Sequence, residues 1–295
     1  MPELPEIEHL RRTLSPVLIG ATVMRVRLDR PDIIRPVRGS NDASRARNGH
    51  VSSSPTPRPR LLRGEQITSI ERRGKELAIV AQSGHVLGVH LGMSGQVLLL
   101  ERGRRLDDSR HVHCTWWVGN GGQSHRMVFR DPRRFGGLWA IDSREQLELQ
   151  HWAVLGPDAL TIPQREFKVR LGGTCRAVKS ALLDQKLLAG VGNIYADESL
   201  HAARIHPLRV ASDLHDAESA ALHRAVRRTL RRAIDAGGST IRDYRDGRGD
   251  AGRFARRHRV YGRAELPCLT CRVPLEHLVV SQRTTTFCPR CQPVP

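Results

Sequence analysis

The sequence predicts an α+β protein of two domains, in which a β-rich N-terminal part precedes a helical part that ends in a four-cysteine ribbon. Three observations support this fold class. Short alternating or apolar runs fill the first half of the chain, helical periodicity replaces them in the second half, and two Cys-x2-Cys pairs stand near the C-terminus. At 295 residues the chain is long enough for two ordinary domains, each with its own core.

The first element expected is a helix over Glu6–Leu18. Pro5 is a good first helical residue, and the acidic Glu6 and Glu8 suit the positive end of the helix dipole. Short runs follow, several of them bounded by Gly, Asn or Asp, and they predict the strands of a sandwich or flattened barrel. The expected strands are Thr22–Leu28, Gln66–Arg72, Glu76–Ala81, His85–His90, Gln96–Leu100, His113–Val118, Arg126–Arg130 and Gly137–Ile141.

One segment interrupts these strands. From residue 37 to residue 60 the sequence is mostly Arg, Ser, Asn and Pro, with almost no apolar residue. Such a composition buries too little apolar surface to offset the entropy lost on ordering. We therefore predict a disordered surface insertion.

The second half of the chain changes to helical spacing. Helices are expected over Ala181–Leu188, Ile194–Ala203 and Ala217–Ala236, separated by a Gly-Val-Gly-Asn turn and by a His-Pro pair. The predicted domains are residues 1–154, residues 155–263 and a ribbon of residues 264–295, with the linker near Leu155–Ile162.

The ribbon contains the strongest chemical pattern in the chain. Two Cys-x2-Cys pairs are separated by sixteen residues, and they consist of Cys268, Cys271, Cys288 and Cys291. Zn²⁺ prefers four tetrahedral ligands, so this set predicts one structural zinc ion with no open position. A pair of disulfides is the alternative, but such frameworks belong mostly to small secreted chains. The two other cysteines, Cys114 and Cys175, are expected to be small buried residues.

The charge of the chain indicates its partner. The 48 basic residues outnumber the 30 acidic ones, which gives a net charge of +18 and favours a polyanion such as nucleic acid. A preference for Arg codons is the alternative, because only four of the basic residues are Lys. The chain has no apolar run that predicts a membrane span, and its acidic N-terminus lacks the features of a signal peptide. We therefore expect no membrane partner and a cytoplasmic location.

The extreme N-terminus carries a second chemical pattern. Pro5, Glu6 and Glu8 fit an ordinary helix start, but a helix start does not explain Pro2 followed by Glu3. Removal of Met1 before a small residue exposes the secondary amine of Pro2. An α-amino group has a pKa of about 7.7–8.0, so a useful fraction is neutral at physiological pH. Such an amine is a nucleophile toward a sugar C1′, and an adjacent carboxylate can move the protons.

Seven motifs then occur in order along the chain. They are Pro2-Glu-Leu-Pro-Glu6, Arg72-Arg-Gly-Lys75, His90-Leu-Gly-Met-Ser-Gly95, Asp131-Pro-Arg-Arg-Phe-Gly136, Gly190-Val-Gly-Asn-Ile-Tyr195, Gly237-Gly-Ser-Thr-Ile-Arg-Asp243 and Gln282-Arg-Thr-Thr-Thr-Phe-Cys288. Together with the ribbon, they closely resemble the bacterial formamidopyrimidine-DNA glycosylases, which excise 8-oxoguanine and cleave abasic sites. Leu4 favours this branch, because the related endonuclease VIII branch usually has Gly there.

The resemblance implies an N-terminal β-sandwich, a helix-two-turn-helix domain and the zinc ribbon, with damaged duplex DNA between the domains. It also implies a monomer that acts on the bacterial nucleoid. Pro2 would be the nucleophile, Glu3 the proton shuttle and Glu6 a support for the N-terminal geometry. Lys75 and Arg283 would contact phosphates near the lesion.

Other residues match the motifs that hold the DNA in this family. Met93, Arg133 and Phe135 would fill the space left by the flipped base, and we expect them on exposed loop tips. Asn193 would contact phosphate at a helix start or act as an ordinary N-cap. The stretch 237–263 would close over the extruded base, with the expected contacts Thr240, Arg242 and Tyr244.

Further expectations concern three acidic residues and the alternative functions. Asp197 and Glu198 are expected to face solvent or to pair locally rather than to act in catalysis. Glu76 stands where the family pattern predicts an aromatic residue, which implies altered packing beside Lys75. The alternative functions are excision of oxidised pyrimidines, as in the endonuclease VIII branch, and DNA binding without catalysis by a basic zinc-ribbon protein.

Overall fold

The computed structural model describes residues 1–38, 59–101, 103–104, 106 and 109–294. Most of the predicted insertion therefore lies outside the described residues. The chain forms two compact units. The N-terminal unit comprises Met1–Pro2, Glu6–Val154 and Thr240–Gly252, and the C-terminal unit comprises Glu3–Pro5, Leu155–Ser239 and Arg253–Pro295.

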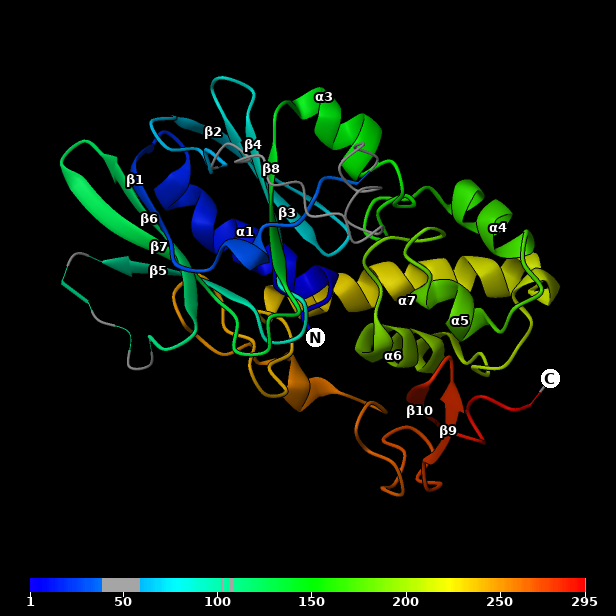
Figure 1. Ribbon diagram of the computed structural model, residues 1–295. Coiled ribbons are helices and arrows are strands. Elements are labelled where there is room, and N and C mark those ends of the chain that lie inside the picture. The colour runs from blue at the N-terminus through cyan, green and yellow to red at the C-terminus, as the bar shows by residue number, and fades with distance from the viewer. Residues whose placement is uncertain (39–58, 102, 105, 107–108, 295) are drawn as a thin grey trace. The chain divides into compact units, whose positions relative to one another are not determined.

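Two four-stranded antiparallel sheets build the N-terminal unit (Figure 1). One sheet has the order β1-β6-β7-β5 and the other β2-β3-β4-β8. The strands are β1 (Thr22–Leu28), β2 (Ile67–Arg73), β3 (Glu76–Ala81), β4 (Val86–His90), β5 (Gln96–Glu101), β6 (Val112–Asn120), β7 (Gln123–Arg130) and β8 (Gly137–Ile141). All eight expected strands are thus present, and none differs in position by more than a few residues.

Helix α1 (Leu4–Leu18) contributes to the core between these sheets. Its apolar residues recur at helical spacing on one buried face, and they are Ile7, Leu10, Leu14 and Leu18. They pack in one cluster with Trp116 and Phe129 of the first sheet and Ile79 and Leu138 of the second. Strand β1 of the first sheet carries several exposed residues, whereas every residue of β3 in the second sheet is buried.

Helices build the C-terminal unit. They are α4 (Gln164–Gly172), α5 (Val178–Leu183), α6 (Asn193–Ala203) and α7 (Asp216–Asp235), and a short helix α3 (Arg144–Gln146) lies earlier, in the N-terminal unit. Phe167, Tyr195 and Leu230 are among the residues of their buried core. The strands β9 (Glu276–Val280) and β10 (Arg283–Phe287) then pair as an antiparallel hairpin.

Two helical expectations were wrong. Helix α5 spans Val178–Leu183 rather than 181–188, because the Asp184 carboxylate accepts a hydrogen bond from the Lys186 amide (2.9 Å) and turns the chain. Helix α4 was not expected, since only Phe167 and Leu171 on it are buried. Among the described residues, none of the helices combines the length and apolar character that a bilayer span requires.

Candidate active site and zinc site

Glu3 lies at the amino end of helix α6. Its side chain is buried, and its carboxylate accepts hydrogen bonds from the amides of Gly192 (2.8 Å) and Ile194 (3.0 Å). A Cβ on residue 192 would lie 2.3 Å from the carboxyl carbon of Glu3, so this approach requires glycine. The free amides and the dipole of a helix start stabilise an anion. The carboxylate is therefore held in one place, one residue after the buried Pro2.

Lys75 lies in the turn between β2 and β3, as the sequence predicts, and its side chain is buried. Gly74 precedes it with a φ of +56°, a conformation that favours glycine. The Arg72 guanidinium donates hydrogen bonds to the Gly74 carbonyl (3.0 Å) and to the Glu8 carboxylate (3.1 Å). These contacts fix the turn, and with it the backbone of Lys75, to helix α1.

Asp131 shapes the loop that presents Arg133 and Phe135. Its fully buried carboxylate accepts hydrogen bonds from the Ser94 hydroxyl (2.6 Å) and the Gly136 amide (2.7 Å). Within this anchored turn, the Phe135 side chain is 52% exposed, and the Arg133 guanidinium lies 4.7 Å from the centroid of the Phe135 ring. The prediction that both side chains are exposed on a loop tip is confirmed.

Met93 differs from that prediction, because it is half-buried. Its loop packs against the loop of Phe135 so closely that a Cβ on Gly92 would lie 2.4 Å from the Phe135 carbonyl carbon. Gly92 also has a φ of +60°.

Asn193 and Arg283 lie on adjacent parts of the C-terminal unit. The Asn193 side-chain amide donates a hydrogen bond to the Thr284 carbonyl (2.9 Å), which follows Arg283 in β10. Asn193 is the first residue of α6, so it is not the N-cap, and Glu3 accepts the first amides instead. The exposed Arg283 follows a two-residue turn, Ser281-Gln282, in which both residues have positive φ. Arg283 therefore lies at the tip of the β9–β10 hairpin, where it pairs with Val280.

The three loop residues differ in exposure. Arg242 is exposed and Thr240 is half-buried, whereas Tyr244 is only 4% exposed. The Tyr244 hydroxyl donates a hydrogen bond to the backbone carbonyl of Glu6 (3.0 Å). In this structure Tyr244 is therefore an internal contact of the N-terminal unit, and the expectation that its side chain faces DNA is corrected.

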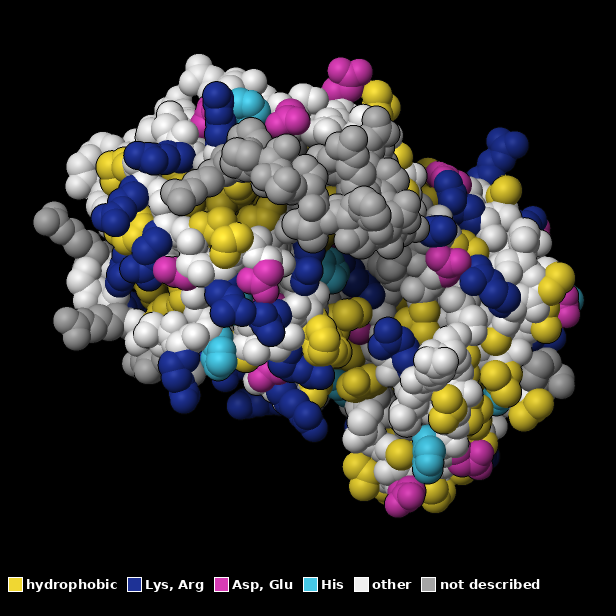
Figure 2. Space-filling view, in the orientation of Figure 1, with side chains coloured by type: hydrophobic (Ala, Val, Ile, Leu, Met, Phe, Trp, Pro, Cys, Tyr) yellow, Lys and Arg dark blue, Asp and Glu magenta, His cyan; other side chains and the backbone are white. Residues whose placement is uncertain are grey.

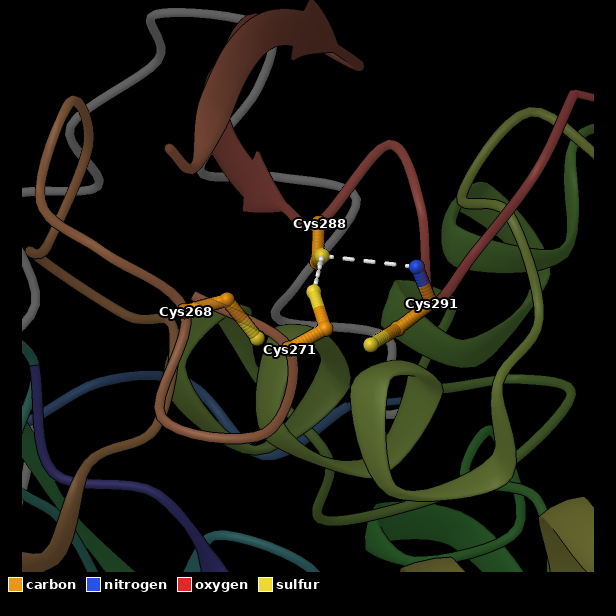
Figure 3. A group of neighbouring side chains, drawn as sticks. All are labelled: Cys268, Cys271, Cys288 and Cys291. Atoms are coloured by element: carbon orange, nitrogen blue, oxygen red, sulfur yellow. Dashed lines mark hydrogen bonds between the residues drawn. The ribbon is translucent and has the colours of Figure 1, made fainter. Parts of the chain in front are cut away.

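The four ribbon cysteines point toward one another (Figure 3), and their sulfur atoms all lie within 4.8 Å of one another. Burial and then the neighbouring thiols of Cys271 and Cys288 raise the pKa of Cys291 to about 12. Four thiolates at this separation repel one another strongly unless a cation lies among them. The residues therefore fit a tetrahedral zinc ion, held by all four thiolates in a closed structural site.

Comparisons with known proteins agree with this geometry. Residues 1–138 match the formamidopyrimidine-DNA glycosylase N-terminal domain, residues 155–245 its H2TH domain, and residues 265–294 the zinc finger found in FPG and IleRS. The formamidopyrimidine-DNA glycosylase of Bacillus subtilis is 39% identical over 99% of this chain and 99% of its own length.

Solved structures show the same similarity. The crystal structure of the MutM (Fpg) protein from Thermus thermophilus has 38% identity and a TM-score of 0.79, covering 99% of this chain and 98% of that one. The Lactococcus lactis Fpg in complex with DNA containing an abasic site has 28% identity and a TM-score of 0.81, covering 99% and 100%.

The chain belongs to the formamidopyrimidine-DNA glycosylase family. The expected α+β fold, the helix-two-turn-helix domain and the structural zinc are confirmed. The predicted enzyme class, a DNA glycosylase, is confirmed as well.

This glycosylase contains a buried ion pair between Lys179 and Asp197 that the sequence analysis did not predict. Lys179 is fully buried, and its ammonium lies 2.6 Å from the Asp197 carboxylate and donates to the Thr285 hydroxyl (2.6 Å). Burial raises the pKa of Asp197 to about 6, against the opposing effect of Lys179. Asp197 also accepts the Thr286 amide (3.1 Å), so the pair joins α5 and α6 to the strand of Arg283. Lys179 is one of only four lysines in the chain, and this rarity is the sequence feature that could have drawn attention to it.

Glu198 and Cys175 also differ from expectation. Glu198 does not face solvent; its buried carboxylate accepts hydrogen bonds from the amides of Arg259 (2.9 Å), Val260 (2.9 Å) and Tyr261 (3.0 Å). Asp197 is likewise buried rather than exposed. Cys114 is buried as predicted, but Cys175 is exposed.

Glu76, which stands where the sequence analysis expected an aromatic residue, belongs to a buried polar network. Its carboxylate lies 2.6 Å from the Arg38 guanidinium and 3.1 Å from the His151 ring, and it accepts the Trp152 indole N–H (3.2 Å). Burial raises the pKa of Glu76, but the hydrogen bond from His151 and the charge of Arg38 outweigh it, so the net shift is downward. The altered packing that was expected beside Lys75 thus consists of the buried Glu76 carboxylate and its partners Arg38 and His151.

Proposed function

We propose that this glycosylase excises oxidised purines from duplex DNA through the amine of Pro2 and then cleaves the abasic strand. The relatives are named for formamidopyrimidine, and one solved complex contains a Fapy-dG lesion. The single observation that supports the mechanism best is the Glu3 carboxylate, which is fixed at the start of α6 beside the residue that carries the amine.

The reaction begins when the free amine of Pro2 attacks C1′ of the damaged nucleotide. The bond from C1′ to the base breaks, the base leaves with the electron pair and takes up a proton, and Glu3 moves protons between the amine and the sugar oxygen. Ring opening gives an iminium between Pro2 and C1′. The iminium acidifies the C2′ proton, so loss of the 3′ phosphate and then of the 5′ phosphate follows, and water releases the sugar fragment.

Residues of both units are assigned to the DNA. Lys75, Asn193 and Arg283 would contact phosphates near the lesion, because they combine cationic or amide donors with fixed backbones. Arg133, Phe135 and Met93 would fill the space of the extruded nucleotide. Glu6 supports the N-terminal geometry through its backbone carbonyl, and we infer a monomer that acts on cytoplasmic DNA.

Borohydride trapping tests this mechanism, because it reduces an iminium to a stable covalent adduct. Purified protein without Met1 is mixed with a duplex containing 8-oxoguanine opposite cytosine, with Pro2→Gly and undamaged duplex as controls. We expect an adduct that requires both the lesion and Pro2.

Two other results would overturn parts of the proposal. An adduct that forms only on an oxidised pyrimidine would retain the mechanism and reject the substrate class. Tight binding without an adduct on any lesion or abasic site would identify a DNA-binding protein without catalysis. Intact mass establishes beforehand that Met1 is absent, because a retained Met1 blocks the amine.

A further inference from the structure

Glu76 places a negative charge one residue after Lys75, the proposed phosphate contact. Both side chains are buried, and Glu76 is the first residue of strand β3. Charges on buried groups are screened much less by water and salt than charges on exposed groups. An uncharged aromatic residue was expected at position 76, so this chain has to accommodate an anion beside a residue that attracts phosphate.

Arg38 reaches this carboxylate from the segment that follows β1. Its guanidinium donates a hydrogen bond to Glu76 at 2.6 Å and another to the His151 carbonyl at 3.4 Å. The same guanidinium lies 5.8 Å from the centroid of the Trp139 ring. Because a guanidinium keeps its proton throughout the pH range of folded proteins, Arg38 is a permanent positive charge at this position.

Glu76 carries its negative charge in these surroundings. The His151 ring lies 3.1 Å from the carboxylate, and the Trp152 indole N–H donates to it (3.2 Å). Burial raises the pKa of Glu76, but the hydrogen bond from His151 and the charge of Arg38 shift it below its ordinary value. The carboxylate is therefore ionised at neutral pH. All of these residues belong to the N-terminal unit.

His90 shows that the charges of Lys75, Arg38 and Glu76 act at one place. It ends strand β4 and pairs in register with Glu76. Burial lowers the pKa of the His90 ring; the charge of Glu76 opposes this shift, and the charges of Lys75 and Arg38 add to it. Since charges shift a pKa mainly at short range, the three side chains lie around this ring. The Gly92 amide donates to Nδ1 of His90 (3.2 Å), which fits a neutral ring.

Arg38 thus offsets a charge that would otherwise act on Lys75. Without the guanidinium, the surroundings of His90 would become more negative by one elementary charge, and Glu76 would lose a cation 2.6 Å away. A buried carboxylate that has lost its cation attracts other cations nearby. Phosphate would then compete with Glu76 for the Lys75 ammonium, and the uncompensated carboxylate would also repel it.

We propose that Arg38 is a positioning residue that neutralises Glu76, so that this carboxylate does not compete with DNA phosphate for the Lys75 ammonium. The proposal rests on the proposed function, because it assigns Lys75 to phosphate. Arg38 acts on Glu76 and not on the DNA, so its removal should matter only while position 76 is charged and Lys75 is present. An ion pair that only stabilises the fold has no such dependence on Lys75.

Double-mutant cycles on DNA affinity test this proposal. The probe is a duplex with a tetrahydrofuran in place of the damaged nucleotide, which cannot form an iminium, and affinity is measured by fluorescence anisotropy. Arg38→Met, which keeps the length of the side chain, should weaken binding roughly tenfold, as for one uncompensated charge close to a phosphate. Adding Glu76→Gln should restore affinity to within about twofold of wild type, because the double variant has the wild-type net charge. In a Lys75→Ala background, Arg38→Met should change affinity by less than about twofold.

Arg144→Met is the matched control. Arg144 also lies 2.6 Å from a carboxylate of the same unit, that of Glu71, but this pair is away from Lys75 in the sequence. The control variant should bind the probe like wild type. Urea unfolding of each variant measures the effect on stability separately from the effect on DNA affinity.

Three results would overturn the proposal: wild-type affinity in Arg38→Met, a loss that Glu76→Gln does not restore, or an equal loss with and without Lys75. If Arg38→Met does not fold, the double variant, which buries no unpaired charge, is compared with wild type. Weaker binding by the double variant would then identify Arg38 as a direct DNA contact and reject its role through Glu76. Wild-type affinity in Lys75→Ala would reject the phosphate assignment in the proposed function, and the role of Arg38 with it. Weak binding by Lys75→Ala together with wild-type binding by Arg38→Met would reject the role of Arg38 alone.

Discussion

Glu8 is a buried carboxylate that three arginines hold in its charged form. Arg11 binds it through two nitrogens (2.9 and 3.0 Å), and Arg12 and Arg72 add contacts at 3.0 and 3.1 Å. Burial alone would raise the pKa of Glu8, but the hydrogen bond and charge of Arg11, with Arg72 and Arg12, lower it from 4.5 to about 2. The same carboxylate fixes the Arg72 side chain that orders the turn of Lys75.

This pKa predicts an acid-dependent stability. The folded pKa lies below the unfolded value, so the contribution is fully present above pH 4.5 and is lost as the pH falls toward about 2. The shift corresponds to about 3 kcal/mol of unfolding free energy. Urea unfolding should show that Glu8→Gln is less stable at neutral pH and loses less stability between pH 4.5 and pH 2 than wild type.

Glu166→Gln is the control for this prediction. Glu166 pairs with Arg170 at helical spacing, but its side chain is 41% exposed, so its loss should change stability by less than about 1 kcal/mol. If Glu8→Gln kept the full acid dependence of wild type, the assignment of that dependence to Glu8 would be wrong.

Single residues also mark the limit of prediction from sequence. The exposure of Arg133 and Phe135 was predictable, because their loop is bounded by a proline and a glycine that prevent burial in a strand. The burial of Glu198 was not, since its partners are the amides of residues 259–261, about sixty positions away. A residue whose environment is made by distant backbone leaves no local pattern.

At the scale of elements, the local sequence pattern predicted the bounds of the strands more accurately than those of the helices. The bounds of β1, β3 and β8 agree with the alternating or apolar runs and the flanking turn residues. Helix α5 ends early because one aspartate side chain competes for the backbone, and α4 has too few buried residues to show a period. Helices whose stability comes from packing are thus less visible in the sequence than strands of a two-faced sheet.

Helix α6 also contacts the zinc ribbon directly. The buried His201 ring nitrogen lies 3.6 Å from the Cys268 sulfur, the distance of an N–H···S hydrogen bond. Groups that donate to a metal ligand orient it and increase metal affinity. His201→Phe, which keeps an aromatic ring and removes the donor, should release zinc to a chromogenic chelator about tenfold faster than wild type.

His277→Phe serves as the comparison, because His277 lies on the exposed β9 strand of the same hairpin. It should release zinc at the wild-type rate. Identical release from His201→Phe and wild type would show that the contact does not stabilise the metal site.

At the scale of the whole molecule, the charge is the dominant property. Lys and Arg side chains far outnumber acidic ones on the face shown in Figure 2, and the net charge is +18. A protein that neutralises phosphates releases counterions, so its DNA affinity falls with salt at a logarithmic slope of about −0.9 per phosphate contacted. Binding to undamaged duplex should therefore weaken steeply as salt rises.

The residues proposed to contact phosphate make this prediction specific. Arg283→Ala should reduce the magnitude of the salt slope by about 1. Arg290→Ala, in the same ribbon, is the control that shows how far the loss of one positive charge alone changes this slope. Fluorescence anisotropy over a salt series gives both slopes. A flat wild-type profile would contradict binding through phosphates.

The division of the chain into two units has a mechanical consequence for Pro2 and Glu3. The peptide bond between them is trans and is also a point where the chain passes from one unit to the other. Consecutive Cα atoms across a trans peptide stay about 3.8 Å apart, whatever the rest of the chain does. The Pro2 amine and the Glu3 carboxylate therefore belong to neighbouring residues whose spacing is fixed by one peptide bond, even though the two residues belong to different units.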